Sequence, residues 1–199
     1  MKRFLSVLML FCAATATAQT DVHSLLNEVA DGFRKMAGYE VRFKVETEGQ
    51  HVEGGYAVQK EAYYLAMGYA EVYSEGKIRY EVNNERREVV VNSVDPASRN
   101  ILDNPVHAFE FLEEEYAARI LWEKDGRTGV ELEKRTDEPD LKQKVTVVVN
   151  TKTCRPETLL YDYDGDSVLV TILGVAPLKE PLKKYDKKAY KAYETIDFR

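Results

Sequence analysis

The chain lacks any hydrophobic run long enough to span a bilayer, which takes about 20 apolar residues. Its main uncharged apolar stretch runs only from Phe4 to Ala14. Lys2 and Arg3 precede this stretch, and the small residues of Ala16-Thr17-Ala18 follow it. This order is typical of a secretory signal peptide, so we predict that residues 1–18 are removed on export. No cysteine stands just after the predicted cleavage site, as a lipid anchor would require, and we expect the exported chain to be soluble.

Cysteine is nearly absent. The sequence contains Cys12, which would leave with the signal peptide, and Cys154. A single thiol cannot form an internal disulfide, so the core must stabilise the fold, and the remaining 181 residues are enough to build one. Beside Pro156, Cys154 is more typical of a buried thiol than of a nucleophile. We expect residues 19–199 to form one domain.

Positive charge is also scarce, because 26 basic and 34 acidic side chains remain after residue 18, a net charge of −8. This balance argues against general nucleic-acid binding, which needs a basic surface. The lysines are unevenly placed, since six of them lie between Lys179 and Lys191. That run is either a solvated connector or a docking patch for an acidic partner or an anionic head group.

Patterns that indicate catalysis are missing. The three histidines have no partners at the usual metal-ligand spacing. The sequence contains neither a Gly-rich phosphate loop nor a Gly-x-Ser-x-Gly elbow. With 34 carboxylates, acid–base pairs arise by chance. We therefore expect no catalytic residue, no metal and no cofactor, and the hypothesis of an envelope hydrolase has only the abundant carboxylates in its favour.

What the sequence does contain is a regular spacing of apolar residues. Apolar residues at helical spacing predict a helix over 21–36, with Asp21 as N-cap. Period-two alternation then predicts successive strands, of which 39–46 is the clearest. Gly54-Gly55 predicts a bulge or bend in the second strand. Residues 74–91 predict a hairpin that turns tightly at Asn83-Asn84.

The middle of the chain interrupts this alternation. Asn104-Pro105 is typical of a helix start, and Val106, Phe109 and Leu112 would form the apolar stripe of that helix. Strands resume near residue 120 and continue to a last strand over 193–198. The whole pattern predicts an α+β fold: a strongly curved antiparallel sheet of about 9–11 strands, an incomplete barrel whose concave side is covered by helices.

Tyrosine is plentiful in the first half of this predicted sheet, where seven fall between Tyr39 and Tyr80. Tyrosine can line a cavity that meets both apolar chains and polar head groups, or it can simply pack in the sheet core.

The order of elements resembles the LolA-like family of periplasmic outer-membrane lipoprotein carriers. The resemblance extends over 25–198 and includes the helix leading into Tyr39, the Gly54-Gly55 strand and the Ser74-Glu75-Gly76-Lys77 turn. It also includes Asn104-Pro105, which resembles the start of the family's lid helix, and the final strand. In one place the sequence differs: Gln59-Lys60-Glu61-Ala62 stands where the family usually has a basic residue and then Arg-Pro. The family's arginine helps to hold the lid, so here the contact with the lid must differ or be absent.

The resemblance implies a periplasmic carrier, not an enzyme, that acts as a chaperone for the acyl chains of lipoproteins or lipids. It would shield them in an apolar cavity and hand them toward the outer membrane. Its partners would be an inner-membrane release complex and an outer-membrane acceptor, and we expect a monomer that does not span the membrane. The residues expected to line the cavity are Val41, Phe43, Leu65, Met67, Ile78 and Tyr80 from the sheet, with Val106, Phe109 and Leu112 from the lid. The alternative hypothesis is a non-catalytic sensor or interaction module on the same fold, in which the lysine run is the working surface.

Overall fold

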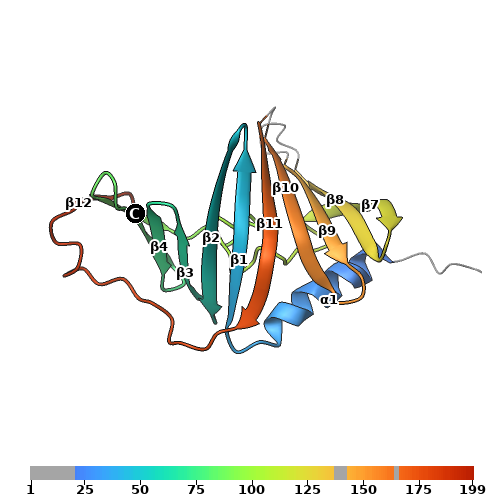
Figure 1. Cartoon of the computed structure of the whole chain (residues 1–199), viewed down its shortest axis with the longest axis horizontal. Coiled ribbons are helices and arrows are strands. Elements are labelled where there is room, and N and C mark those ends of the chain that lie inside the picture. The colour runs from blue at the N-terminus through green and yellow to red at the C-terminus, as the bar shows by residue number, and fades with distance from the viewer. Residues whose placement is uncertain (1–20, 137–142, 164–165) are drawn as a thin grey trace, which may run out of the picture.

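The computed structural model of the chain describes residues 21–136, 143–163 and 166–199, so the predicted signal peptide lies outside the described residues. Within these ranges it contains one α-helix and twelve strands (Figure 1). The elements are α1 Val22–Arg34, β1 Tyr39–Thr47, β2 Gln50–Gln59, β3 Ala62–Met67, β4 Ala70–Ser74, β5 Ile78–Asn83, β6 Glu88–Ser93, β7 Tyr116–Lys124, β8 Arg127–Lys134, β9 Lys144–Asn150, β10 Arg155–Tyr163, β11 Asp166–Pro177 and β12 Glu194–Asp197.

All twelve strands belong to one open sheet, in the order β12-β6-β5-β4-β3-β2-β1-β11-β10-β9-β8-β7. The pairs are antiparallel except for β12, which lies parallel to β6. The predicted fold class is confirmed, and the sheet has more strands than the 9–11 expected. No helix among the described residues is long and apolar enough to cross a membrane.

Helix α1 begins where the sequence predicts. The Asp21 carboxylate accepts a hydrogen bond from the His23 backbone N–H at 3.3 Å, which satisfies one of the free donors at the helix start. The apolar side chains at helical spacing, among them Leu25, Val29 and Phe33, are buried. They pack against one side of the sheet, which we call the inner face.

The inner face is set by the alternation of β1. Val41 and Phe43 point to α1, while Glu40 and Arg42 point to the opposite, outer face. Two segments without regular secondary structure cover the sheet, one on each face. Residues 94–115, the cover, pack with α1 on the inner face, and residues 178–193, the strap, run along the outer side from β11 to β12 (Figure 1).

The predicted lid helix is wrong, because the cover consists of successive turns. His107 N–H donates to the Asn104 carbonyl and Glu110 N–H to the His107 carbonyl, so these bonds span three residues instead of four. Side chains take the place of helical bonds: the Tyr39 hydroxyl donates to the Pro105 carbonyl, and the Asn104 amide donates to the Asp95 carbonyl. Sheet contacts therefore override the local helix signal.

Two local predictions about the strands also need correction. Asn83 pairs with Glu88, so the β5–β6 turn has four residues, and Arg87 rather than an asparagine adopts the left-handed conformation, with φ of 56°. Of the bulge or bend predicted at Gly54-Gly55, the bulge is absent, since the register of β2 with β1 and β3 is unbroken there. Gly54 is required because a Cβ there would come within 2.9 Å of the Phe43 ring.

Candidate functional site: the inner face and its cover

The inner face carries a continuous apolar core. Val41 and Phe43 of β1 and Leu65 of β3 have at most 3% of their surface exposed. Phe109 of the cover is equally buried. Met67 and Val106 are partly buried against the same cluster. Six of the nine predicted site residues therefore lie together, although Leu112 is half-buried outside this core.

Ile78 and Tyr80 do not lie there, and their predicted placement is wrong. Leu65 pairs with Val72, and Val72 pairs with Glu81, which puts the odd-numbered residues of β5 on the inner face. Ile78 and Tyr80 face outward, where Tyr185 of the strap stacks on Tyr80 with ring centroids 4.1 Å apart. Arg79 lies on the inner face instead and is buried beneath the cover.

The space between the sheet and its covering segments is filled by side chains. Ile101 and Ala108 of the cover are fully buried, and the Phe109 ring stacks on Phe33 of α1 at 4.4 Å. A cavity of about 210 Å³ opens at the edge of this core, between α1, the cover and the β2–β3 turn. The apolar interior on the inner face is thus closed except for this cavity at its edge, which we call the mouth.

Sheet side chains hold the backbone of the cover. The Tyr63 hydroxyl and the Arg79 guanidinium both donate to the Asp103 carbonyl at 2.9 Å, and Arg79 also forms an ion pair with the Asp103 carboxylate. Further along, the Tyr161 hydroxyl accepts the Ile101 N–H at 3.0 Å. Burial raises the pKa of Tyr63 to about 12, so its phenol remains a donor over the physiological range.

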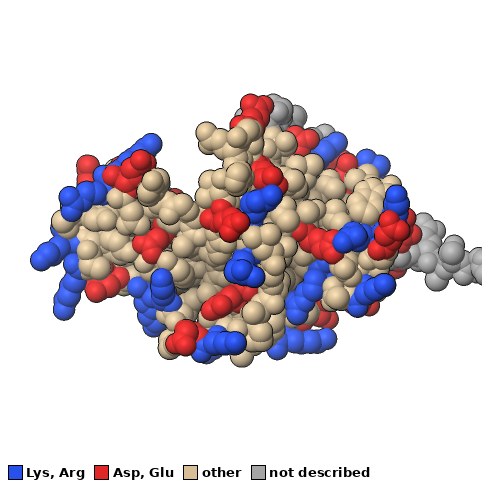
Figure 2. Space-filling view, viewed as in Figure 1, with Lys and Arg blue, Asp and Glu red and all other residues tan. Residues whose placement is uncertain are grey.

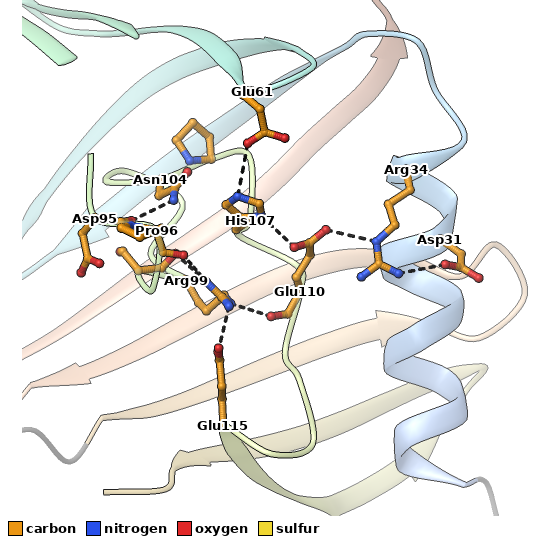
Figure 3. Close-up of polar contacts among 12 residues, drawn as sticks. Asp31, Arg34, Glu61, Asp95, Pro96, Arg99, Asn104, His107, Glu110 and Glu115 are labelled. Carbon is orange, nitrogen blue, oxygen red and sulfur yellow. Dashed lines mark hydrogen bonds and ion pairs between the residues drawn. The ribbon is translucent and has the colours of Figure 1, made fainter. Parts of the chain in front are cut away.

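Arg99 connects separate parts of the cover to one another (Figure 3). Its buried guanidinium donates to the Glu110 carbonyl at 2.6 Å, to the Pro96 carbonyl at 2.9 Å and to the Glu115 carboxylate at 2.8 Å. A buried charge that is fully hydrogen-bonded fixes geometry, because any other arrangement leaves it unpaired. Arg99 therefore gives a segment without regular secondary structure a defined shape.

A chain of charged groups crosses the mouth, as Figure 3 shows. His107 of the cover contacts the Glu110 carboxylate at 2.7 Å and lies 3.7 Å from that of Glu61 in the β2–β3 turn. Arg34 of α1 donates to Glu110 at 3.1 Å. The hydrogen bond from His107 is the largest cause that lowers the pKa of Glu110, to about 2, and the same bond raises the pKa of His107. The mouth is thus closed by an ion network joining α1, the cover and the sheet.

This network involves the place where the sequence departs from the family pattern. Glu61, where the resemblance would put arginine, faces His107 across the mouth. Arg79, two strands away, supplies the cation that binds the cover's backbone. Reasoning from the sequence missed Arg34, Arg79, Arg99, His107 and Glu110 as site residues, because their partners are distant in the chain or lie within the irregular cover.

Comparisons with known proteins support the fold. No protein-family model matches the chain, and no curated protein does. Among solved structures, an uncharacterized conserved protein from Thermus thermophilus aligns with a TM-score of 0.52 at 7% identity, over 88% of this chain and 98% of that one. LprF from Mycobacterium bovis aligns with a TM-score of 0.42 at 14% identity, over 79% and 94% of the two chains. A LolA superfamily protein from Nitrosomonas europaea aligns with a TM-score of 0.42 at 10% identity, over 86% and 98%. The Thermus thermophilus protein supports the overall fold, and at 7% identity this likeness concerns the fold alone.

Proposed function

We propose that this protein is a periplasmic carrier that shields the acyl chains of lipoproteins or lipids on the inner face of its sheet and performs no catalysis. The observation that carries the proposal is the combination of an extended apolar inner face with a cover of irregular structure. The cover is held mainly by side chains, such as Tyr63 and Arg79, so it can leave the face without unpairing the strands of the sheet.

Since the interior is filled, cargo must take the place of the cover. The cover buries Ile101, Phe109 and Phe111 against the sheet. Full burial of such a side chain contributes about 1.5–3 kcal/mol, whereas each acyl methylene contributes about 0.8 kcal/mol, so a palmitoyl chain offers roughly 12 kcal/mol. One acyl chain can therefore replace three cover side chains with a gain in apolar burial.

Release then requires an acceptor with a more apolar site, because the carrier has no covalent step that would expel its cargo. We infer that cargo is received from an inner-membrane release complex and passed to an outer-membrane acceptor. The mouth network suits this passage, since Glu110 of the cover, which His107 contacts, accepts a hydrogen bond from Arg34 of α1.

The test uses the full chain exported to the periplasm and purified without detergent. Native mass spectrometry should show a population with bound lipid. A synthetic diacylated lipopeptide with a diazirine at an acyl end should give photo-crosslinks within residues 99–111 and on the inner-facing residues of β1–β3. A lipid-free mass, together with no uptake of the lipopeptide, would contradict carriage.

A second candidate function is an interaction module that binds an acidic partner, and the exposed lysines of the strap favour it. Lys179, Lys183, Lys184, Lys187, Lys188 and Lys191 are all exposed. Figure 2 shows basic side chains gathered around the end of the molecule where the strap approaches β12. Replacing the six lysines by glutamine should abolish capture of a periplasmic partner if this function holds, and should leave lipopeptide uptake unchanged if the carrier function holds.

A further inference from the structure

A groove lies on the outer face of the sheet, opposite the interior described above. It has a volume of about 450 Å³, within the range of small-molecule sites, roughly 300–1,000 Å³. Its floor is formed by the outer face of β1, β2 and β3, and its wall by strap residues 178–183. A second hollow of about 580 Å³ adjoins it and shares Leu178, Glu180 and Pro181.

Part of the groove's floor is built from small residues. Gly55 pairs with Ala66 across β2 and β3, and Ala57 lies beside them on the same outer face. The strap passes over this floor with Leu178 and Leu182 in the wall.

The strap that forms the wall is anchored at both ends. Its first residue, Leu178, donates its N–H to the Gly38 carbonyl at 2.9 Å. Further along, Tyr185 stacks on Tyr80, and the Tyr190 hydroxyl lies 2.8 Å from that of Tyr73 and donates to Glu71 at 3.1 Å. These contacts form the groove before a ligand arrives, which lowers the cost of ordering on binding.

The groove is lined by charges of both signs. Lys183 lies 4.6 Å from the centre of the Tyr64 ring, with its ammonium 3.3 Å from the hydroxyl. Arg42 is exposed and forms no ion pair with any residue that the structure describes. Glu40 and Glu180 line the same groove. Figure 2 shows acidic and basic side chains close together over these central strands.

We propose that this groove binds a single-chain amphiphile whose head carries both a phosphate and an ammonium group. The acyl chain lies on the Gly55–Ala57 floor beneath Leu178 and Leu182. Arg42 binds the phosphate, for which a guanidinium is well suited, and Glu40 and Glu180 bind the ammonium group. The ligand site is separate from the inner face and is occupied while the cover remains closed.

The test uses dodecanoyl lysophosphatidylethanolamine with a diazirine at the chain end, below its micelle concentration, and the exported chain. Photo-crosslinks are expected in 178–183 and on the outer-facing residues of β2 and β3. Ala57→Trp fills the floor and should weaken binding at least tenfold. Ala117→Trp, on the outer side of β7 and far from the groove in the sheet order, is the matched control and should leave binding unchanged.

Head-group specificity gives a second readout that does not depend on filling the floor. Arg42→Gln should weaken both this lipid and its lysophosphatidylglycerol analogue about tenfold, whereas Glu40→Gln should weaken only the former. Crosslinks confined to the cover, or an affinity insensitive to Ala57→Trp, Arg42→Gln and Glu40→Gln, would overturn the proposal. If the lipopeptide of the carrier test still crosslinks within 99–111 in Ala57→Trp, the inner face binds acyl chains independently of the groove. Failure of one site can then be distinguished from failure of the other.

Discussion

Replacing Arg79 by methionine should release the cover while leaving the sheet intact. The substitution keeps an unbranched apolar side chain about as long as the aliphatic part of arginine, and it removes the guanidinium with its charge. It deletes the 2.9 Å bond to the Asp103 carbonyl and the ion pairs with Asp103 and Glu81. The Asp103 carbonyl retains the Tyr63 hydroxyl as a donor.

The magnitude follows from the exposure of the partners. Removing one member of a fully buried ion pair costs about 3–5 kcal/mol, because the other charge is left buried. Here the side chains of Asp103 and Glu81 are 42% and 36% exposed, so water can solvate them. The cost should therefore be that of hydrogen bonds to a charged group, about 2 kcal/mol, which corresponds to roughly a 30-fold rise in cover opening.

Native-state hydrogen exchange measures this opening directly. Amides of 99–111, above all the Ile101 N–H that Tyr161 holds, should exchange about 30-fold faster in Arg79→Met, while those of β1 and β2 change less. Arg119→Met is the control, since Arg119 pairs with Glu131 on the surface and its loss should leave the exchange of the cover amides unchanged. Equal exchange of the cover amides in wild type and Arg79→Met would refute the assignment of Arg79 as the residue that holds the cover.

Three further changes test the packing, the mouth and the strap. Gly54→Ala should lower the free energy of unfolding by about 1–3 kcal/mol in urea denaturation, because its methyl group would overlap the Phe43 ring; a neutral result would contradict the observed packing. The pKa of Glu110 is held at about 2, below its ordinary 4.5, so its contribution of up to about 3 kcal/mol is present above pH 4.5 and is lost as the pH falls toward 2. In Glu110→Gln this part of the acid destabilisation should be missing from urea titrations between those pH values, and an unchanged pH profile would show that the bond to His107 stabilises nothing. Tyr190→Ala should free the strap for limited proteolysis without changing the unfolding midpoint by more than a few degrees, and equal proteolysis rates would show that the strap is held elsewhere.

The sheet was predictable because its signals are local. The alternation of Tyr39, Val41 and Phe43 reflects burial of one side of a strand, and a period of two has no other common cause. The helix at Val22–Arg34 was predictable for the same reason, from its apolar spacing and its Asp21 cap. Short turns between such strands lead to an antiparallel sheet, so the order of the elements carried most of the topology.

The cover was not predictable, because its structure depends on partners far away in the sequence. Asn104-Pro105 is a good local helix start, but the Pro105 carbonyl is taken by Tyr39 and the Asp103 carbonyl by Tyr63 and Arg79. These partners are 24 to 66 residues apart in the sequence. Local propensity is a weak prior that such tertiary contacts override.

The face of the β5–β6 hairpin shows why alternation alone could not place the site. Ile78, Tyr80 and Val82 do form one apolar face, but the outer face is also covered there, by the tyrosines of the strap. A sheet with covering segments on both sides offers two apolar environments, so a pattern of apolar residues identifies a face without saying which one. Only the pairing followed strand by strand from Val41 decides the question, and it puts Arg79 under the cover. The same hairpin therefore fastens the inner cover with its charged side and the outer strap with its aromatic side, and a substitution at an odd or an even position of β5 should affect one cover and spare the other.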